Sequence, residues 1–291
     1  MAKLIFVDAN FLIPQTLRDV YNSDLKKTKG NNNLLTNNMT VNQNLIDGAL
    51  ADTKSLVELI KGIEDKNLSI TSGVHKQCGM INNILENINE REQNYVFSKL
   101  NVSFSAEVCK GNDDRFKTLK GIREGMSLIK DVIDSNIYHK SNDILSNSIR
   151  EYISGIKMFL EVSKVDHKFD YETDDSIIIS AIYESLVKQN DVEVYTGDFD
   201  IKKTLSTAIT TIERVKLLVD GIEGFDFMLK NRPKLYDHDK YSISEVASSN
   251  FDYCVGELRG DGDYFNKLTP FSRFVRNSIN HLAEEMKNYK P

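Results

Sequence analysis

Two short apolar segments, far apart in the chain, each lead directly into aspartate residues. Val192-Glu-Val-Tyr-Thr-Gly-Asp-Phe-Asp200 joins β-branched and aromatic residues, typical of a strand, to a glycine that ends it. Leu4-Ile-Phe-Val-Asp8 repeats the arrangement near the start of the chain. Ligands of open α/β sheets bind at the carboxyl ends of the strands. We therefore expect Asp8, Asp198 and Asp200 to face one crevice.

A third acidic segment, Thr173-Asp-Asp-Ser176, opens an apolar helix directly before the second of these strands. Carboxylates that lie close together raise one another's pKa, and a cation removes that cost. Mg²⁺ and Mn²⁺ prefer oxygen ligands and are commonly held by a few carboxylates together with water and phosphate. The three acidic segments therefore predict a divalent-metal site.

Each acid also has a purely structural interpretation. The two aspartates after Thr173 fit the first turn of a helix, where Thr173 can cap and acids favour the helix dipole. Asp8 can cap the helix that follows its strand, and Asp198 and Asp200 can be turn residues. The joint pattern favours a shared site, because acids follow buried strands at opposite ends of the chain and the third segment leads into one of those strands.

Composition limits the class of protein. The chain has 291 residues, 40% of them hydrophobic, and a net charge of −6 from 37 basic and 43 acidic residues, so no global charge predicts a polyanion ligand. Cys78, Cys109 and Cys254 are odd in number and widely spaced, which argues against a disulfide framework and a zinc site. The first apolar run is too short for a signal peptide, and no later run reaches membrane-spanning length. We predict a cytoplasmic protein without a membrane partner.

The hydrophobic pattern predicts an α/β chain with a parallel sheet. The predicted strands are 3–7, 67–72, 101–109, 192–196 and 224–229. The predicted helices cover 45–64, 74–88, 113–165, 174–187, 204–220 and 270–287. An asparagine-rich loop from Asp24 to Asn44, with a basic start, is open to two interpretations, a surface excursion or a basic flap over a substrate.

Three short motifs resemble those of PIN-domain ribonucleases. Phe6-Val-Asp-Ala-Asn-Phe-Leu12 is similar to the family's opening motif, and Asp174-Asp-Ser-Ile177, with Ala181 one turn on, resembles its later helix motif. Tyr195-Thr-Gly-Asp-Phe-Asp200 is similar to its final motif. The order and strand context of the motifs agree with the family.

The resemblance implies a three-layer α/β/α fold around a central parallel sheet and a Mg²⁺- or Mn²⁺-dependent endonuclease that cuts single-stranded or structured RNA. Asp8, Asp174 and Asp198 would be the catalytic metal ligands. Asp175 and Asp200 would be neighbouring metal ligands. Asn10 and Thr196 would support the acids through hydrogen bonds. A protein inhibitor or a second copy of the chain is a further partner that the resemblance leaves open.

Two features depart from the family pattern. Gln77 stands where an early helix glutamate is usual, and its carbonyl can coordinate a metal but brings no charge. Glu86 and Glu90 would replace it only under a shifted alignment. We predict a PIN-like nuclease domain at 1–229, with a helical insertion at about 80–165 that small members lack, and a C-terminal extension of unassigned role at 230–291.

Alternatives from other classes remain. A neutral Gln77 is also compatible with a catalytically weak PIN-like scaffold that binds RNA or a protein. A phosphatase of the haloacid-dehalogenase type is disfavoured, because position 10 is Asn10 where that class needs a second aspartate. The basic residues between Arg115 and Arg123 recur near helical spacing and either follow an RNA backbone or form a solvated face.

Overall fold

The computed structural model describes residues 3–25, 43–64, 67–101, 106–139, 144–162, 173–218 and 234–236, together with 277–278, 281–282 and 284–285. The chain forms two compact units, each built from separate segments. The sheet unit comprises Met1–Phe11, Lys66–Val74 and Ile137–Pro291, and the helical unit comprises Leu12–Asp65 and His75–Asn136. The predicted division at residue 229 stays a prediction, because the residues on either side of it lie outside the described part.

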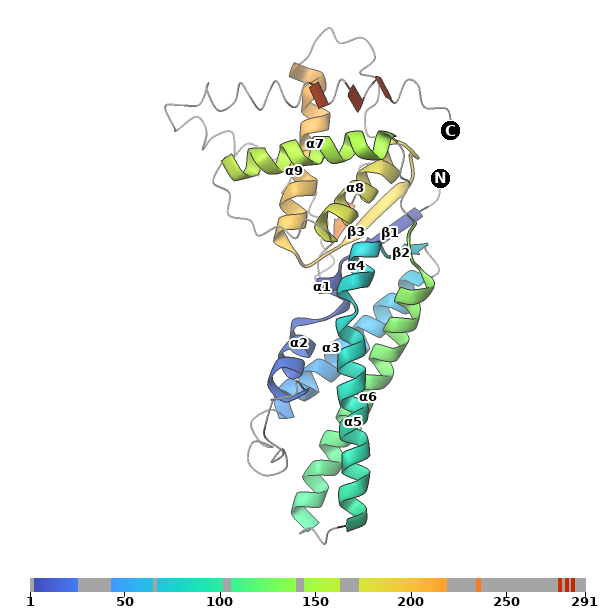
Figure 1. Cartoon of the computed structure of the whole chain (residues 1–291), viewed down its shortest axis with the longest axis vertical. Coiled ribbons are helices and arrows are strands. Elements are labelled where there is room, and N and C mark those ends of the chain that lie inside the picture. Colours follow the sequence, from blue (N-terminus) through green and yellow to red (C-terminus); the bar gives the residue numbers. More distant parts are fainter. Residues whose placement is uncertain are drawn as a thin grey trace. The chain divides into compact units, whose positions relative to one another are not determined.

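The sheet unit contains a four-stranded parallel sheet with the order β2-β1-β3-β4 (Figure 1). Its strands are β1 (Lys3–Val7), β2 (Leu68–Ser69), β3 (Asp191–Tyr195) and β4 (Lys234–Tyr236). The inner strands β1 and β3 pair over their full length, from Lys3 beside Asp191 to Val7 beside Tyr195. Their apolar side chains are buried, as expected for central parallel strands. The α/β class and the parallel sheet are thereby confirmed.

Three longer helices accompany the sheet: α7 (Ile144–Val162), α8 (Thr173–Leu186) and α9 (Phe199–Leu218). Helix α8 contacts β1, β3, α7 and α9, and most of its side chains are buried. Its run of isoleucines suits this position, since a helix that is apolar on all sides is stable only inside a core. The hydroxyl of Tyr152 donates to the carbonyl of Ala208 at 2.6 Å and connects α7 to α9.

Two strands of the sheet lead into short helices. Helix α1 (Ala9–Leu12) begins directly after β1, and α4 (Ser72–Gln77) begins shortly after β2. Both helices begin in the sheet unit and end in the helical unit. The carboxyl ends of β1 and β2 are therefore joined to helices with almost no intervening loop.

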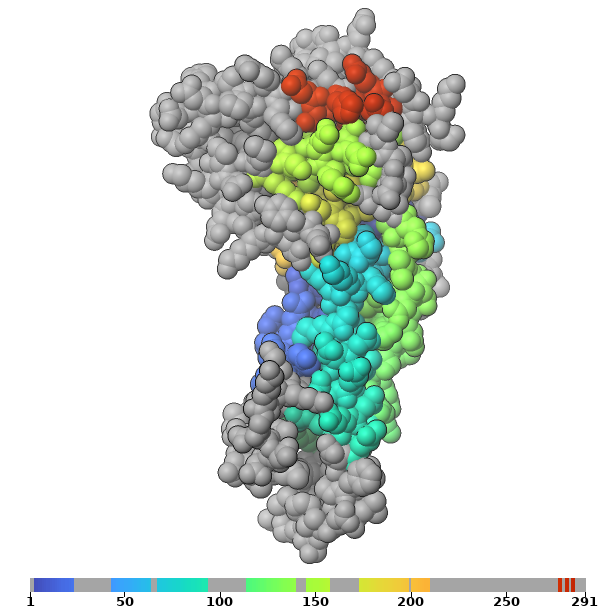
Figure 2. Space-filling view, in the orientation of Figure 1, coloured from blue at the N-terminus to red at the C-terminus, as the bar shows by residue number. Residues whose placement is uncertain are grey.

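The helical unit consists of α2 (Gln15–Val20), one stretch of π-helix (Tyr21–Leu25), α3 (Gln43–Glu64), α5 (Met80–Asn101) and α6 (Ala106–Ser135). Helices α3 and α6 pack closely because α6 carries glycines at the contact. A Cβ at Gly121 would lie 2.8 Å from Cδ1 of Leu50, and one at Gly125 would lie 2.5 Å from Cγ2 of Thr53. Side chains of α5 and α6 lie side by side on the face drawn in Figure 2. No helix in the described residues is long and apolar enough to span a membrane.

One predicted strand is wrong and another strand was not predicted. Residues 101–109 alternate like a strand, but the described residues of this segment are helical, since α5 ends at Asn101 and α6 begins at Ala106. Strand β4, only three residues long, was not predicted. The predicted strand 224–229 lies outside the described residues. So does most of the predicted loop, although its first residues, Asp24 and Leu25, belong to the π-helix.

Candidate functional site

Asp8 follows β1 directly and is only 1% exposed. Its backbone N–H donates to the carbonyl of Tyr195 at 2.8 Å, and its own carbonyl accepts from the N–H of Phe11 at 3.1 Å. The first bond continues the pairing of β1 with β3, and the second begins the turn into α1. Asp8 therefore sits at the carboxyl edge of the sheet with its backbone held on both sides.

Thr196 occupies the corresponding position after β3 and is fully buried. Its hydroxyl donates to Oδ2 of Asp8 at 2.9 Å and accepts from the backbone N–H of Asp198 at 2.9 Å. The register explains this contact: Val7 pairs with Tyr195, so the next residue of each strand lies directly opposite. Asp8 and Thr196 therefore lie side by side at the ends of the two inner strands.

Asp198 has two functions in its surroundings. Its Oδ1 accepts a hydrogen bond from the backbone N–H of Asp200 at 2.7 Å, and its backbone carbonyl accepts one from the backbone N–H of Lys202 at 3.3 Å. Asp198 therefore caps the start of α9. Its Oδ2 accepts from Nδ2 of Asn10 at 3.3 Å. Asp200 itself lies in the first turn of α9, 4.0 Å from Nζ of Lys203. The side chain of Asp198 therefore both caps α9 and contacts Asn10, just after β1.

The electrostatics of this corner favour a positive ligand. Burial, together with the negative charge of Asp198, raises the pKa of Asp8 to about 6, against the hydrogen bonds from Thr196 and the backbone N–H groups of Asn10 and Ala9. Two carboxylates that repel each other in a poorly solvated place are stabilised by a cation. Asp8, Thr196, Asp198 and Asn10, which we call the strand-end site, therefore form the candidate functional site.

The first turn of α8 reaches the same edge of the sheet through β2. The hydroxyls of Ser176 and Thr71 lie 2.7 Å apart. Because Phe6 pairs with Ser69, the register places Thr71, two residues past the end of β2, level with Asp8. Asp174, two residues before Ser176, is buried as well, with 5% exposure. The structure thus brings the predicted helix motif to the same edge as the strand-end site.

A lysine that the sequence motifs did not indicate pairs with the acids of α8. Lys157 of α7 is 7% exposed, and its ammonium group is bonded to Oδ1 of Asp175. Burial lowers the pKa of Lys157, whereas the hydrogen bond and charge of Asp175 and the charge of Asp174 act in the opposite direction. The sequence indicates this pairing only weakly: Lys157 directly follows Ile156 on α7, a helix with an apolar face.

The predicted metal ligands stay a prediction, and the described residues show how far they fit one ion. In the described part of the chain, no group of three or more histidine, cysteine, aspartate or glutamate side chains could hold one metal ion. Mg²⁺ is usually bound through one or two carboxylates, with water and substrate phosphate completing its shell, so the donor chemistry of Asp8 and Asp198 fits Mg²⁺ or Mn²⁺. Ligation by Asp174, Asp175 and Asp200 stays a prediction. Gln77 is the last residue of α4 and belongs to the helical unit, so its supporting role also stays a prediction.

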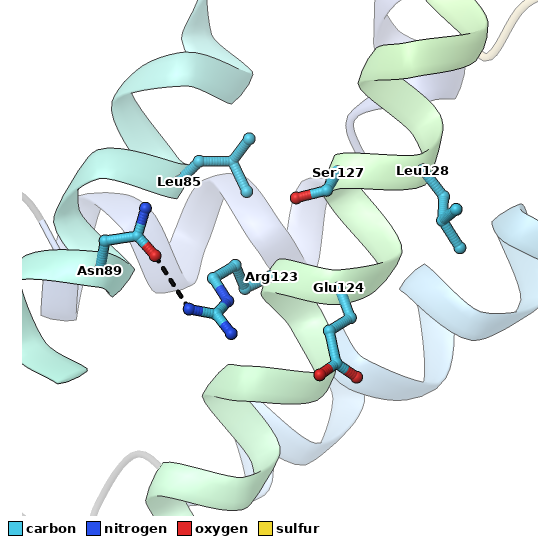
Figure 3. A pocket seen from close by; sticks show the side chains of 6 residues that line it. All are labelled: Leu85, Asn89, Arg123, Glu124, Ser127 and Leu128. Carbon is cyan, nitrogen blue, oxygen red and sulfur yellow. Dashed lines mark hydrogen bonds between the residues drawn. The ribbon is translucent and has the colours of Figure 1, made fainter.

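The helical unit contains a separate hollow of about 560 Å³ between α5 and α6 (Figure 3). Its cation, Arg123, donates to Oδ1 of Asn89 at 3.0 Å and is paired with Glu92, so α5 already satisfies much of this guanidinium group. The neighbouring Lys117 and Lys120 pair with acids of their own helix. This row of basic residues therefore has the character of a solvated helix face.

Comparison of the chain with protein-family models finds no match, and neither does comparison with curated proteins or with solved structures. Any inference about function therefore depends on the residues at the carboxyl edge of the sheet. Two carboxylates and two neutral hydrogen-bond donors come together there from segments 188 positions apart in the sequence.

Proposed function

We propose that this protein is a metal-dependent endoribonuclease that hydrolyses RNA phosphodiester bonds at the strand-end site. One observation carries the proposal: Asp8 and Asp198, from the ends of adjacent parallel strands, are joined through the hydroxyl of Thr196. This is the arrangement that the resemblance to PIN-domain ribonucleases implies for those positions. A three-layer PIN-like fold is part of the proposal, supported by the pairing of β1 with β3 and the packing of α8 on both strands.

In the proposed reaction, the carboxylates of Asp8 and Asp198 would hold Mg²⁺ or Mn²⁺, which would make a bound water more acidic and polarise the scissile phosphate. Thr196 keeps Asp8 in one orientation, and Asn10 does the same for Asp198, so the site is arranged before a ligand arrives. Asp8 must be ionised to hold a cation, and its pKa of about 6 implies that binding strengthens as the pH rises through 6.

The test is cleavage of single-stranded and structured RNA in the presence of Mn²⁺. Asp8→Asn and Asp198→Asn should each slow cleavage by at least about 100-fold, because several kcal/mol of charge stabilisation are lost. Asp191→Asn is the matched control: it makes the same change in the same unit, but at the amino end of β3, and should leave the rate unchanged. Cleavage that survives in both site variants would refute the nuclease proposal.

A second candidate is a PIN-like scaffold that binds RNA or a protein without cutting. It is favoured by the bond between Lys157 and Asp175, which occupies one of the predicted ligands, and by the neutral Gln77. Calorimetric titration separates the two functions. Heat of binding with Mn²⁺ at or below millimolar concentration supports the nuclease, and its absence supports the scaffold.

A further inference from the structure

Asn10 contacts both acids of the strand-end site. Its backbone N–H donates to the carboxylate of Asp8, and its side-chain Nδ2 donates to Oδ2 of Asp198 at 3.3 Å. An asparagine amide has one donor atom and one acceptor atom, whereas an ionised carboxylate can only accept. The Oδ1 atom of Asn10 is therefore not the atom bonded to Asp198, and within the described residues it accepts no hydrogen bond.

The bond between Asn10 and Asp198 is long. It measures 3.3 Å, compared with 2.9 Å from Thr196 to Asp8 and 2.7 Å from the backbone of Asp200 to Asp198. Neighbouring oxygen ligands of an octahedral Mg²⁺ lie about 3.0 Å apart, because each is about 2.1 Å from the ion and their bonds meet at a right angle. The Nδ2 atom thus lies from Oδ2 of Asp198 at nearly the distance that a second ligand would have.

The amide of Asn10 can exchange its two polar atoms without moving the rest of the side chain. A half-turn about the terminal bond puts Oδ1 where Nδ2 now lies, and this torsion is nearly two-fold in its preferences. Without a cation, the donor faces Asp198, since two oxygen atoms would repel. With a cation on Asp198, the carbonyl is favoured there, because asparagine carbonyls bind hard divalent cations.

We propose that Asn10 is the third protein ligand of the divalent ion, which it reaches with Oδ1 after a half-turn of its amide. This inference rests on the proposed function and deepens it by completing the ligand set of the strand-end site. A neutral carbonyl adds a ligand without adding a third charge to the repulsion between Asp8 and Asp198. It also agrees with the described part of the chain, where no three acids, histidines or cysteines could share an ion.

The test measures the distance from bound Mn²⁺ to the amide carbon of Asn10. The full chain is produced with ¹³C at the side-chain amide carbon of asparagine, and electron–nuclear double resonance locates the nearest label. A ligating carbonyl places this carbon about 3 Å from the ion, from a metal–oxygen bond of about 2.1 Å and a C=O bond of about 1.2 Å. The close signal should disappear in Asn10→Leu. A wild-type spectrum without a label at this distance would overturn the inference.

Mn²⁺ affinity, measured by calorimetry, gives an independent result. Asn10→Leu keeps the size of the side chain but has no oxygen, so it should bind Mn²⁺ at least about tenfold more weakly. Asn190→Leu is the matched control, because Asn190 also donates its amide to a carboxylate of the sheet unit, that of Glu184 at 2.8 Å, but just before β3. Its affinity should equal that of the wild type. Equal affinity of Asn10→Leu and the wild type would contradict ligation by Asn10.

The wild-type spectrum keeps the test decisive if Asn10→Leu does not fold, because it requires no variant. Asp8→Asn separates this inference from the proposed function. If Asp8→Asn loses Mn²⁺ binding while the label in the wild type is distant, the strand-end site holds an ion and Asn10 is not its ligand. If Asp8→Asn binds Mn²⁺ like the wild type, or the wild type binds none, the strand-end site itself is refuted and the inference with it.

Discussion

The sheet unit and the helical unit differ in what they bury. The buried charged side chains of the described residues all belong to the sheet unit: Asp8, Lys157, Asp174, Glu184 and Glu193. In the described part of the helical unit, the buried polar side chains are Thr53 and Thr118, and the charged groups are at least partly exposed. A buried charge is expensive unless it is paired or hydrogen-bonded.

The partners of these buried charges separate structural roles from functional ones. Glu193 is paired with Lys3 at 2.6 Å, and Glu184 accepts from the hydroxyl of Tyr138 at 2.6 Å and from Nδ2 of Asn190 at 2.8 Å. Each of these two buried carboxylates therefore has a cation or neutral hydrogen-bond donors beside it. Asp8 is different, because its neighbouring charge is that of Asp198 and has the same sign. A chain retains such an arrangement at a cost in stability, which is typical of a ligand site.

The largest expected effect concerns Asp8 in metal-free protein. Its pKa rises from 3.8 to about 6 on folding, so between these values the folded chain binds more protons than the unfolded chain, and stability falls as the pH rises. The total fall is about 3 kcal/mol. Asp8→Asn should lack this fall and be more stable than the wild type above pH 6.

This prediction is checked by urea unfolding between pH 4 and pH 7.5 with a chelator present. Mn²⁺ should stabilise the wild type and leave the variant unchanged, since only the wild type gains by binding. If both proteins respond to pH in the same way, Asp8 is not the buried acid that distinguishes the sheet unit.

An intermediate effect is expected where α3 and α6 meet. Gly125→Val places a side chain where even a Cβ would lie 2.5 Å from Thr53, so overpacking should lower the free energy of unfolding by about 2 kcal/mol. Gly48→Ala is the control, because nothing lies within 4 Å of a Cβ there and alanine favours a helix by up to about 1 kcal/mol. Both free energies come from chemical denaturation. Equal stability of the two variants would contradict the packing argument.

The smallest effect is expected at Arg123, whose pairing with Glu92 is partly exposed to solvent. Arg123→Met should cost about 0.5 kcal/mol, and the cost should shrink in high salt, because exposed ion pairs are weak and screened. RNA binding measured by filter retention should not change. A clear loss of RNA binding would show that the basic residues of α6, Lys117, Lys120 and Arg123, contact the substrate.

The central geometry was predictable because it depends on local rules. Leu4 to Val7 and Val192 to Tyr195 have the residues of buried parallel strands, and acids after such strands meet at one edge of a sheet. The structural alternative for Asp198 was a turn residue, and in the structure Asp198 caps α9. The short β4 was not predictable, since three residues carry no period.

The partner of Asp175 was not predictable for a different reason. No sequence period connects Lys157 to the first turn of α8, and their contact depends on how α7 packs against α8. The alternating pattern at 101–109 failed because a short alternation also occurs by chance in helices, and Asn101 and residues 106–109 belong to α5 and α6.

The hydroxyl of Thr196 contributes to two bonds at once, giving its proton to Asp8 and accepting one from the backbone at the start of α9. Hydrogen bonds arranged in series polarise one another, so a weaker bond on one side weakens the other. A proton on Asp8 would therefore weaken the bond that Thr196 makes at the start of α9. Helix α9 packs on α7 and α8, so one hydroxyl group links the carboxylate of Asp8 to this set of packed helices.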